Sequence, residues 1–140
     1  DKNTECLTFY DASGNILMQE KQGGRSMKMS EIMGDPTYEV SQSFVMQEGD
    51  HQFGTGQFQD GQLDIFGLSR RLTQNNSQIV SPVIISNKGY GIATASSRTA
   101  LFCNIKMYGQ YIFVDGDTQS DYYFIGAGSV GHTLELYGTL

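Results

Sequence analysis

Short apolar runs, each followed by a cluster of Gly, Asp, Asn or Ser, recur along the chain and constrain its fold more than any other feature. The first two runs, Cys6–Tyr10 and Ile16–Met18, flank Asp11–Asn15, which is the pattern of a β-hairpin. Over Tyr38–Met46 apolar side chains alternate with polar ones, with Gln42 as the exception. A period of two predicts an antiparallel strand that buries one face. We therefore expect a chain built from strands.

Further apolar runs continue this series at the spacing of a β-sandwich or barrel. We expect strands at Ile79–Ser86, Tyr90–Ala93, Ala100–Met107, Tyr111–Asp115 and Ser120–Ile125. Pro82 predicts a sheet edge or a bulge in the first of them. Only Ser129–Leu140 has helical spacing, with Val130, Leu134 and Tyr137 on one side. The prediction is an all-β antiparallel sandwich over residues 1–128, followed by a linker or short helix over 129–140.

Composition excludes several classes of partner. With 39% hydrophobic and 17% charged residues the chain is globular rather than disordered. Its net charge of -6 argues against a nucleic-acid partner, which requires clustered Lys and Arg. The single basic doublet, Arg70 and Arg71, would point to opposite faces of a strand. The apolar runs are too short to span a bilayer, so we expect no membrane insertion.

No residue pattern indicates a cofactor, a metal site or a catalytic group. Cys6 and Cys103 lie far apart inside apolar runs and are expected to be buried free thiols, with a disulfide as the alternative. His51 and His132 have no metal-ligand spacing and are expected at the surface. Asp115–Thr118 resembles the start of a calcium loop but lacks its later Gly and closing Glu, so a hairpin turn is expected.

Carboxylates and aromatic side chains are the remaining candidates for sugar chemistry. Two carboxylates across a sugar can hydrolyse a glycoside, and Asp60, Asp64 and Asp121 are available. Nothing in the sequence places two of them in one cleft, so each is expected in a turn or on a solvent face. Most aromatic side chains fall at strand positions, where packing is the expected role. Because Tyr122 and Tyr123 are adjacent, one should face the core and the other should face outward.

A series of motifs resembles the N-terminal β-sandwich of glycoside hydrolase family 31, which contains α-glucosidases and α-xylosidases. In order, the matching segments are Phe53–Gln57, Gln59–Gly61, Asn76–Ile79, Ser86–Gly91 and Asp121–Tyr123. Many family members have Glu where this chain has Gln57. The resemblance covers most of the chain and implies a galactose mutarotase-like sandwich.

The resemblance also implies that the catalytic residues lie elsewhere. In this family two catalytic Asp residues lie on a (β/α)8 barrel, expected to follow Leu140, so the 140 residues alone are not expected to be an enzyme. The expected partners are that barrel and, through it, an α-linked oligosaccharide. Relatives have strands upstream of Asp1, so an unpaired sheet edge could promote self-association. A bacterial parent that degrades glycans would place the domain in the periplasm or outside the cell.

One loop of the family's sandwich overhangs the sugar site, and motif order assigns this role to Thr73–Gln78. Gln74, Asn75 and Asn76 are the expected substrate-proximal residues, because amide side chains match sugar hydroxyls. Gln59 and Asp60 would form a supporting turn. The alternative for the loop is an ordinary exposed turn. The alternative for the whole chain is a stand-alone carbohydrate-binding or adhesion sandwich.

Overall fold

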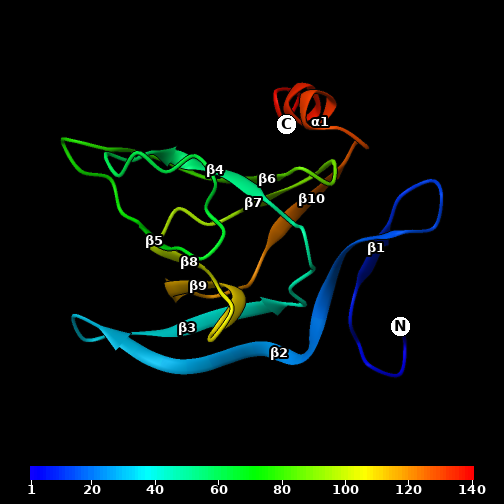
Figure 1. Ribbon diagram of the computed structural model, residues 1–140. Coiled ribbons are helices and arrows are strands. Elements are labelled where there is room, and N and C mark those ends of the chain that lie inside the picture. Colours follow the sequence, from blue (N-terminus) through cyan, green and yellow to red (C-terminus); the bar gives the residue numbers. More distant parts are fainter.

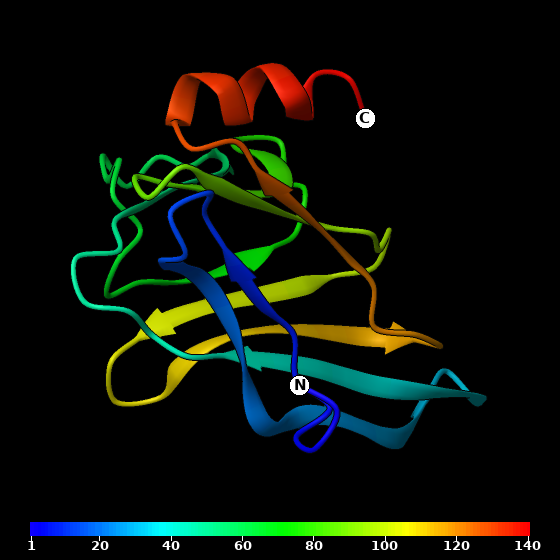
Figure 2. The same ribbon diagram turned by 90° about the vertical axis from the view of Figure 1, so that its right-hand side faces the viewer.

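The computed structural model describes all residues from Asp1 to Leu140 and has two antiparallel sheets and one helix. The larger sheet has the strand order β1-β2-β3-β9-β8-β5 and the smaller has the order β10-β7-β6-β4. Figures 1 and 2 show the two sheets as the layers of a sandwich, with the helix outside the smaller one. The strands are β1 (Thr8–Tyr10), β2 (Ile16–Ile32), β3 (Asp35–Phe44), β4 (Gln52–Gln57), β5 (Ser69–Leu72), β6 (Ile79–Ser86), β7 (Tyr90–Thr94), β8 (Ala100–Ile105), β9 (Gly109–Asp117) and β10 (Tyr122–Gly126), and the helix is α1 (Val130–Tyr137). The predicted all-β sandwich is confirmed.

The core lies between the two sheets and is made of alternate residues of their strands. Ile84 of β6 pairs with Ile92 of β7, which pairs with Phe124 of β10. Across the sandwich, Phe44 of β3 packs edge-on against the Tyr122 ring, with centroids 5.6 Å apart. The core cluster is Leu17, Met18, Phe44, Ile65, Leu72, Ile84, Tyr90, Ile92, Ala100, Phe102, Ile112 and Val114. The period-two pattern therefore determines which face of each strand is buried.

Strands β4 and β6 approach too closely for side chains at two glycines of β4. A Cβ on Gly54 would lie 2.4 Å from the Val83 carbonyl oxygen, and one on Gly56 would lie 2.1 Å from that of Ile79. Both glycines also have positive φ, and the strand pairing is irregular between them. Pro82 lies opposite this irregularity, so the predicted bulge is confirmed.

A polar network is buried between the sheets at one end of the sandwich. The Asp50 carboxylate accepts hydrogen bonds from the Tyr90 hydroxyl (2.6 Å), the Gln52 amide (3.0 Å) and the Ser86 hydroxyl. Gln52 in turn accepts a bond of 3.0 Å from the Asn104 amide, which joins the smaller sheet to the larger. All five side chains are buried. Their hydrogen bonds offset the cost of burying polar groups.

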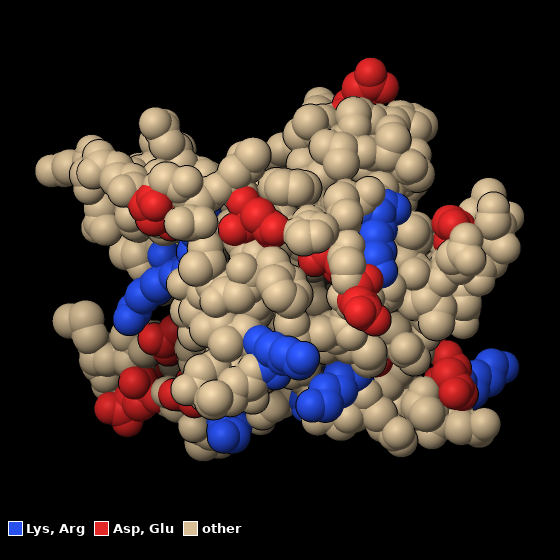
Figure 3. Space-filling view, viewed as in Figure 1, with Lys and Arg blue, Asp and Glu red and all other residues tan.

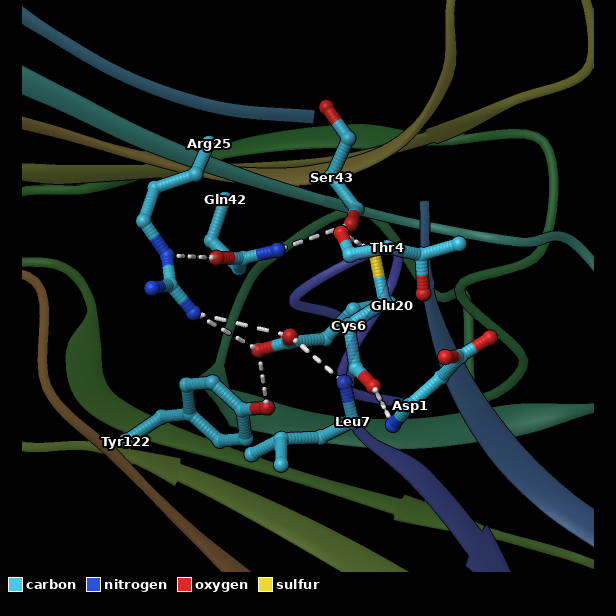
Figure 4. A network of polar contacts seen from close by, with 9 residues as sticks. All are labelled: Asp1, Thr4, Cys6, Leu7, Glu20, Arg25, Gln42, Ser43 and Tyr122. Atoms are coloured by element: carbon cyan, nitrogen blue, oxygen red, sulfur yellow. Dashed lines mark hydrogen bonds and ion pairs between the residues drawn. The ribbon is translucent and has the colours of Figure 1, made fainter. Parts of the chain in front are cut away.

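A second network joins the sheets near the N-terminus (Figure 4). The buried Glu20 carboxylate of β2 accepts hydrogen bonds from the Leu7 backbone N–H (2.9 Å) and the Tyr122 hydroxyl (2.7 Å) of β10. Arg25 donates to Glu20 at 3.3 Å and to the Gln42 side chain at 3.0 Å. Gln42 is the one polar residue at an apolar position of the alternating pattern in β3. It is buried, and its side-chain oxygen accepts the hydrogen bond from Arg25.

Helix α1 lies on the outer face of the smaller sheet (Figure 2). Ser129 caps its N-terminus by accepting a hydrogen bond from the His132 N–H. Thr133 of this helix is fully buried over Gly91 of the sheet. The predicted helix is confirmed, but the expected apolar side, with Leu134 and Tyr137, stays partly exposed. This helix is neither long nor apolar enough to cross a membrane.

Of three local predictions, two are confirmed and one is wrong. Cys6 and Cys103 are buried free thiols, as predicted. Arg70 is buried and Arg71 exposed, as expected for neighbours on a strand. The turn expected at Asp115–Thr118 is wrong, because Asp115 to Asp117 extend β9 and pair with β3.

Candidate functional site

The Thr73–Gln78 loop is a tight turn in which Asn75 and Gln78 form an isolated bridge. The Gln74 side chain is used inside this turn. Its amide oxygen accepts the Val80 backbone N–H at 3.0 Å, and its amide nitrogen donates to the Gln78 carbonyl at 2.9 Å. Gln78 donates to the Thr73 carbonyl at 2.8 Å. Gln74 therefore shapes the loop with its own amide.

Asn75 and Asn76 are the loop residues whose amides remain available to a ligand. Both side chains are exposed, and neither forms a hydrogen bond within the chain. Each amide can donate two hydrogen bonds and accept two, which matches adjacent hydroxyls of a sugar. Three residues were predicted to lie near the substrate. The Gln74 amide is already bonded within the loop, whereas the amides of Asn75 and Asn76 are free to bind a ligand.

The turn predicted to support the loop is joined to β5 by a buried arginine. Arg70 donates to Asp60 at 2.7 Å and to the Thr55 hydroxyl at 3.1 Å, and its guanidinium lies 4.5 Å from the centre of the Phe58 ring. The Gln62 backbone N–H, together with this guanidinium, lowers the pKa of Asp60. The neighbouring Gln59 is exposed. Arg70 lies on β5, the strand that leads into the Thr73–Gln78 loop. The bond from Arg70 to Asp60 therefore holds the Gln59–Asp60 turn to the strand that carries the loop.

A hollow of about 280 Å³ lies at the base of the loop. One wall is formed by Thr73 and Gln74, and the other is Ser96–Thr99, the connection from β7 to β8. Ser96 donates to Asp117, and this bond lowers the pKa of that carboxyl, with the charge of Arg98 adding to the effect. Sequence reasoning did not include this second loop. In the sequence this loop is marked only by three hydroxyl side chains and one cation between two strands, and ordinary turns have the same composition.

The other candidate groups do not line this hollow. Asp64 pairs with His51 at 2.6 Å on the surface; partial burial opposes ionisation, but the bond from His51 lowers the pKa of Asp64. Asp121 and His132 are exposed. No group of three or more His, Cys, Asp or Glu side chains is placed to hold a metal ion.

Beside the hollow lies an apolar groove of about 430 Å³ on the outer face of the smaller sheet. Its floor is Val83 and Ala93, both buried, and its walls include Tyr123 of β10 and Leu140. Pro82 lines both this groove and the hollow at the loop, so the two adjoin at that residue. Figure 3 shows that the part of this view over α1 carries a single acidic side chain, whereas the lower half carries many charges of both signs.

Comparison with known proteins places this geometry in a family. No protein-family model matches the chain. An α-xylosidase from Saccharolobus solfataricus is 31% identical over an alignment 145 residues long, and the match covers 92% of this chain and 19% of that enzyme. The crystal structure of the family 31 α-xylosidase from Xanthomonas citri superposes with a TM-score of 0.66 and 28% identity, over 69% of this chain and 11% of that one. The chain belongs to glycoside hydrolase family 31.

The fold comparison extends over nearly the whole of this chain. A xylosidase from Aspergillus niger superposes with a TM-score of 0.75 over 91% of this chain and 18% of its own length, at 22% identity. The chain thus spans about a fifth of the length of the curated relatives it matches. The predicted resemblance is confirmed, and its Phe53–Gln57 motif has a physical reason. Glycine is needed at Gly54 and Gly56 because β6 passes directly against them.

Proposed function

We propose that this domain is the non-catalytic N-terminal sandwich, of the galactose mutarotase-like type, of an α-glycoside hydrolase with α-xylosidase or α-glucosidase activity. In this proposal it packs on the catalytic barrel and contributes Asn75 and Asn76 to the sugar site. The observation that carries the proposal is the 31% identity to an α-xylosidase over 92% of the chain. Such a domain would bind substrate only together with the barrel.

The apolar groove supports the packing part of the proposal. Tyr123 is 55% exposed and Leu140 is 71% exposed, beside a floor that is already apolar. An exposed apolar patch bordered by polar groups marks an interaction surface. Because Pro82 joins the groove to the hollow, a body seated in the groove would lie next to the Thr73–Gln78 loop.

The ion pairs of the Asp60 and Asp64 carboxylates support the proposal that this domain is non-catalytic. A retaining glycoside hydrolase needs two carboxyl groups about 5–5.5 Å apart across one sugar. Asp60 is bound to Arg70, and Asp64 is bound to His51. Each is therefore part of a separate local structure.

The loop assignment is tested by substitution in the full-length product of the gene. Asn75→Ala and Asn76→Ala should each lower kcat/KM for nitrophenyl α-xyloside or α-glucoside by about 3- to 10-fold, as expected for one lost hydrogen bond to a hydroxyl. Their melting temperatures should stay at the wild-type value, since neither side chain bonds within the chain. Gln119→Ala, another exposed amide on a different loop, is the matched control and should leave kcat/KM unchanged. Equal values for all four proteins would refute the role of the loop.

A stand-alone carbohydrate-binding module is the second candidate, and Tyr123 is the observation that favours it. Its exposed ring beside the groove could stack on a sugar. Titration of the 140-residue chain with xylose and maltose distinguishes the two functions. Binding below 1 mM that is lost in Tyr123→Ala would favour the module, and the absence of binding would favour the accessory domain.

A further inference from the structure

The Thr73–Gln78 loop begins on one sheet and ends on the other. It leaves the larger sheet at the end of β5 and enters the smaller sheet at the start of β6 (Figure 1). At its second end the loop is fixed by β4, because Gly56 pairs with Val80 near the start of β6. The position of the loop amides therefore depends on how β5, at the first end, is held against β4.

Arg70 makes the connection from β5 to β4. Two residues before β5 ends, its buried guanidinium donates from Nη1 to the Thr55 hydroxyl of β4 at 3.1 Å. From Nη2 it donates to the Asp60 carboxylate at 2.7 Å and to the Gln62 carbonyl at 3.1 Å, both in the segment between β4 and β5. The planar guanidinium presents these donors in fixed directions, which a single ammonium does not reproduce. One side chain thus joins the two strands and the segment that connects them.

Thr55 accepts this bond from a backbone conformation that threonine rarely adopts. Its φ is 66°, in the left-handed region, and its neighbours Gly54 and Gly56 also have positive φ. Of the three non-glycine residues with positive φ, only Thr55 is buried. A β-branched residue is strained in this region. The Thr55 hydroxyl donates to the Gly54 carbonyl at 2.6 Å and accepts from Arg70, so this conformation is held by hydrogen bonds on both sides.

A second unfavourable feature lies at the same place. The Nε of Arg70 is buried and has no hydrogen-bond partner within the chain. Folded proteins leave few buried donors unpaired, and they keep strained backbone only where the surrounding structure enforces it, most often at functional sites. Because both features occur together at the base of the loop, they indicate that this geometry is kept to position the loop.

We infer that Arg70 and Thr55 form a clamp that positions the Thr73–Gln78 loop. Through the loop, the clamp places the amides of Asn75 and Asn76 in the sugar site. Arg70 and Thr55 are positioning residues, since they act on the sugar only through these two amides. The role in the sugar site rests on the proposed function, whereas control of the loop conformation by the clamp does not.

Hydrogen–deuterium exchange of the full-length product of the gene tests the clamp. The Val80 N–H is bonded to the Gln74 side chain, and this bond closes the loop. Exchange in peptides that cover residues 73–80 therefore reports the loop conformation. Peptides from β7, in the core of the smaller sheet, report the stability of the whole domain. Loss of the clamp should raise exchange in the first set of peptides alone.

Four variants separate the clamp from its surroundings. Arg70→Lys and Thr55→Val should each speed exchange of residues 73–80 by about 10-fold, as expected when a hydrogen bond of a charged group is lost. Thr55→Val deletes one hydroxyl and keeps the shape of the side chain, so it remains a test if Arg70→Lys does not fold. Thr55→Ser keeps the hydroxyl and should retain the wild-type rate. Arg71→Lys, the same change at the exposed neighbour, is the matched control and should also retain it.

A kinetic double-mutant cycle in the full-length protein tests whether the clamp acts through the loop amides. Arg70→Lys should raise KM for nitrophenyl α-xyloside or α-glucoside about 3-fold or more and change kcat by less than about 2-fold, because the amides bind the sugar without reacting. In a protein that already carries Asn75→Ala and Asn76→Ala, Arg70→Lys should change KM no further. Arg71→Lys should leave KM unchanged in both backgrounds.

The two experiments fail in different ways. Unchanged exchange of residues 73–80 in Arg70→Lys and Thr55→Val, or exchange raised equally in β7, would overturn the inference. An additive effect of Arg70→Lys on KM would also overturn it, because Arg70 would then act independently of the loop amides. A full-length protein inactive on both glycosides would refute the proposed function instead, and the exchange measurements would still decide whether the clamp controls the loop.

Discussion

Replacing Tyr90 by Phe should destabilise the domain through the buried Asp50 network. The Tyr90 side chain is 1% exposed; its hydroxyl donates to Asp50 at 2.6 Å and accepts from Gln52 at 3.0 Å. A hydrogen bond to a charged group contributes about 1.5–3 kcal/mol and a neutral one about 0.5–1.5 kcal/mol. Phe keeps the packing of the ring, so we expect the free energy of unfolding to fall by about 3 kcal/mol. For a chain of this length that lowers Tm by about 10 °C.

Urea unfolding of both proteins at pH 7 measures this loss, with an unchanged slope m as the check on two-state behaviour. Burial, and then the Asp50 carboxylate, raises the pKa of Tyr90 above its ordinary value of 10, so the hydroxyl stays protonated across the neutral range. The difference should therefore not vary between pH 6 and pH 9. Tyr123→Phe, which removes an exposed hydroxyl without a hydrogen bond, is the matched control and should change stability by less than about 0.5 kcal/mol. Equal stability of the two variants would refute the account of the network.

Four other substitutions test the fold and the hollow. Gly56→Ala should cost more than about 3 kcal/mol or prevent folding, whereas Gly61→Ala, also at positive φ but with open space around it, should cost about 1 kcal/mol, as compared by urea unfolding. Ile92→Ala, at a fully buried position, should cost about 3–4 kcal/mol in the same assay. Asp117 should titrate by NMR below the ordinary value of 3.8, and Ser96→Ala should raise its pKa. Because the folded-state pKa is the lowered one, this contribution to stability is present above pH 3.8 and is lost as the pH falls through the folded-state value.

Local pattern was enough to predict the strands whose side chains alternate. The hairpin at Asp11–Asn15 forms because Asp11 binds the backbone of Ser13 and Asn15, and the strands from Ile79 onward lie close to their expected positions. The long distal half of β2 was not predicted. Its sequence through Gly23 and Gly24 has no period of two, and it is extended because β3 pairs with it. Pairing between segments can be decided only by the whole fold.

Polar residues show the same limit at the level of the site. Asp, Gln and Asn are residue types usually found at the surface, so Asp50, Gln52 and Asn104 would be expected there. All three are buried because they bind one another across the sandwich. The loop at Gln74 was predicted from motif order. The Gln74 amide closes this turn, and the Asn75 amide stays free. This arrangement depends on the backbone conformation of the loop, which cannot be predicted from its composition.

The most direct test of the account is a paired activity assay of the 140-residue chain and the full-length product of its gene. Both would be incubated with nitrophenyl α-xyloside and nitrophenyl α-glucoside, and release of nitrophenol would be measured. The account predicts hydrolysis by the full-length protein and none by the chain alone. Hydrolysis by the chain alone, or a full-length protein inactive on both substrates, would contradict the assignment of a non-catalytic domain in an α-glycoside hydrolase.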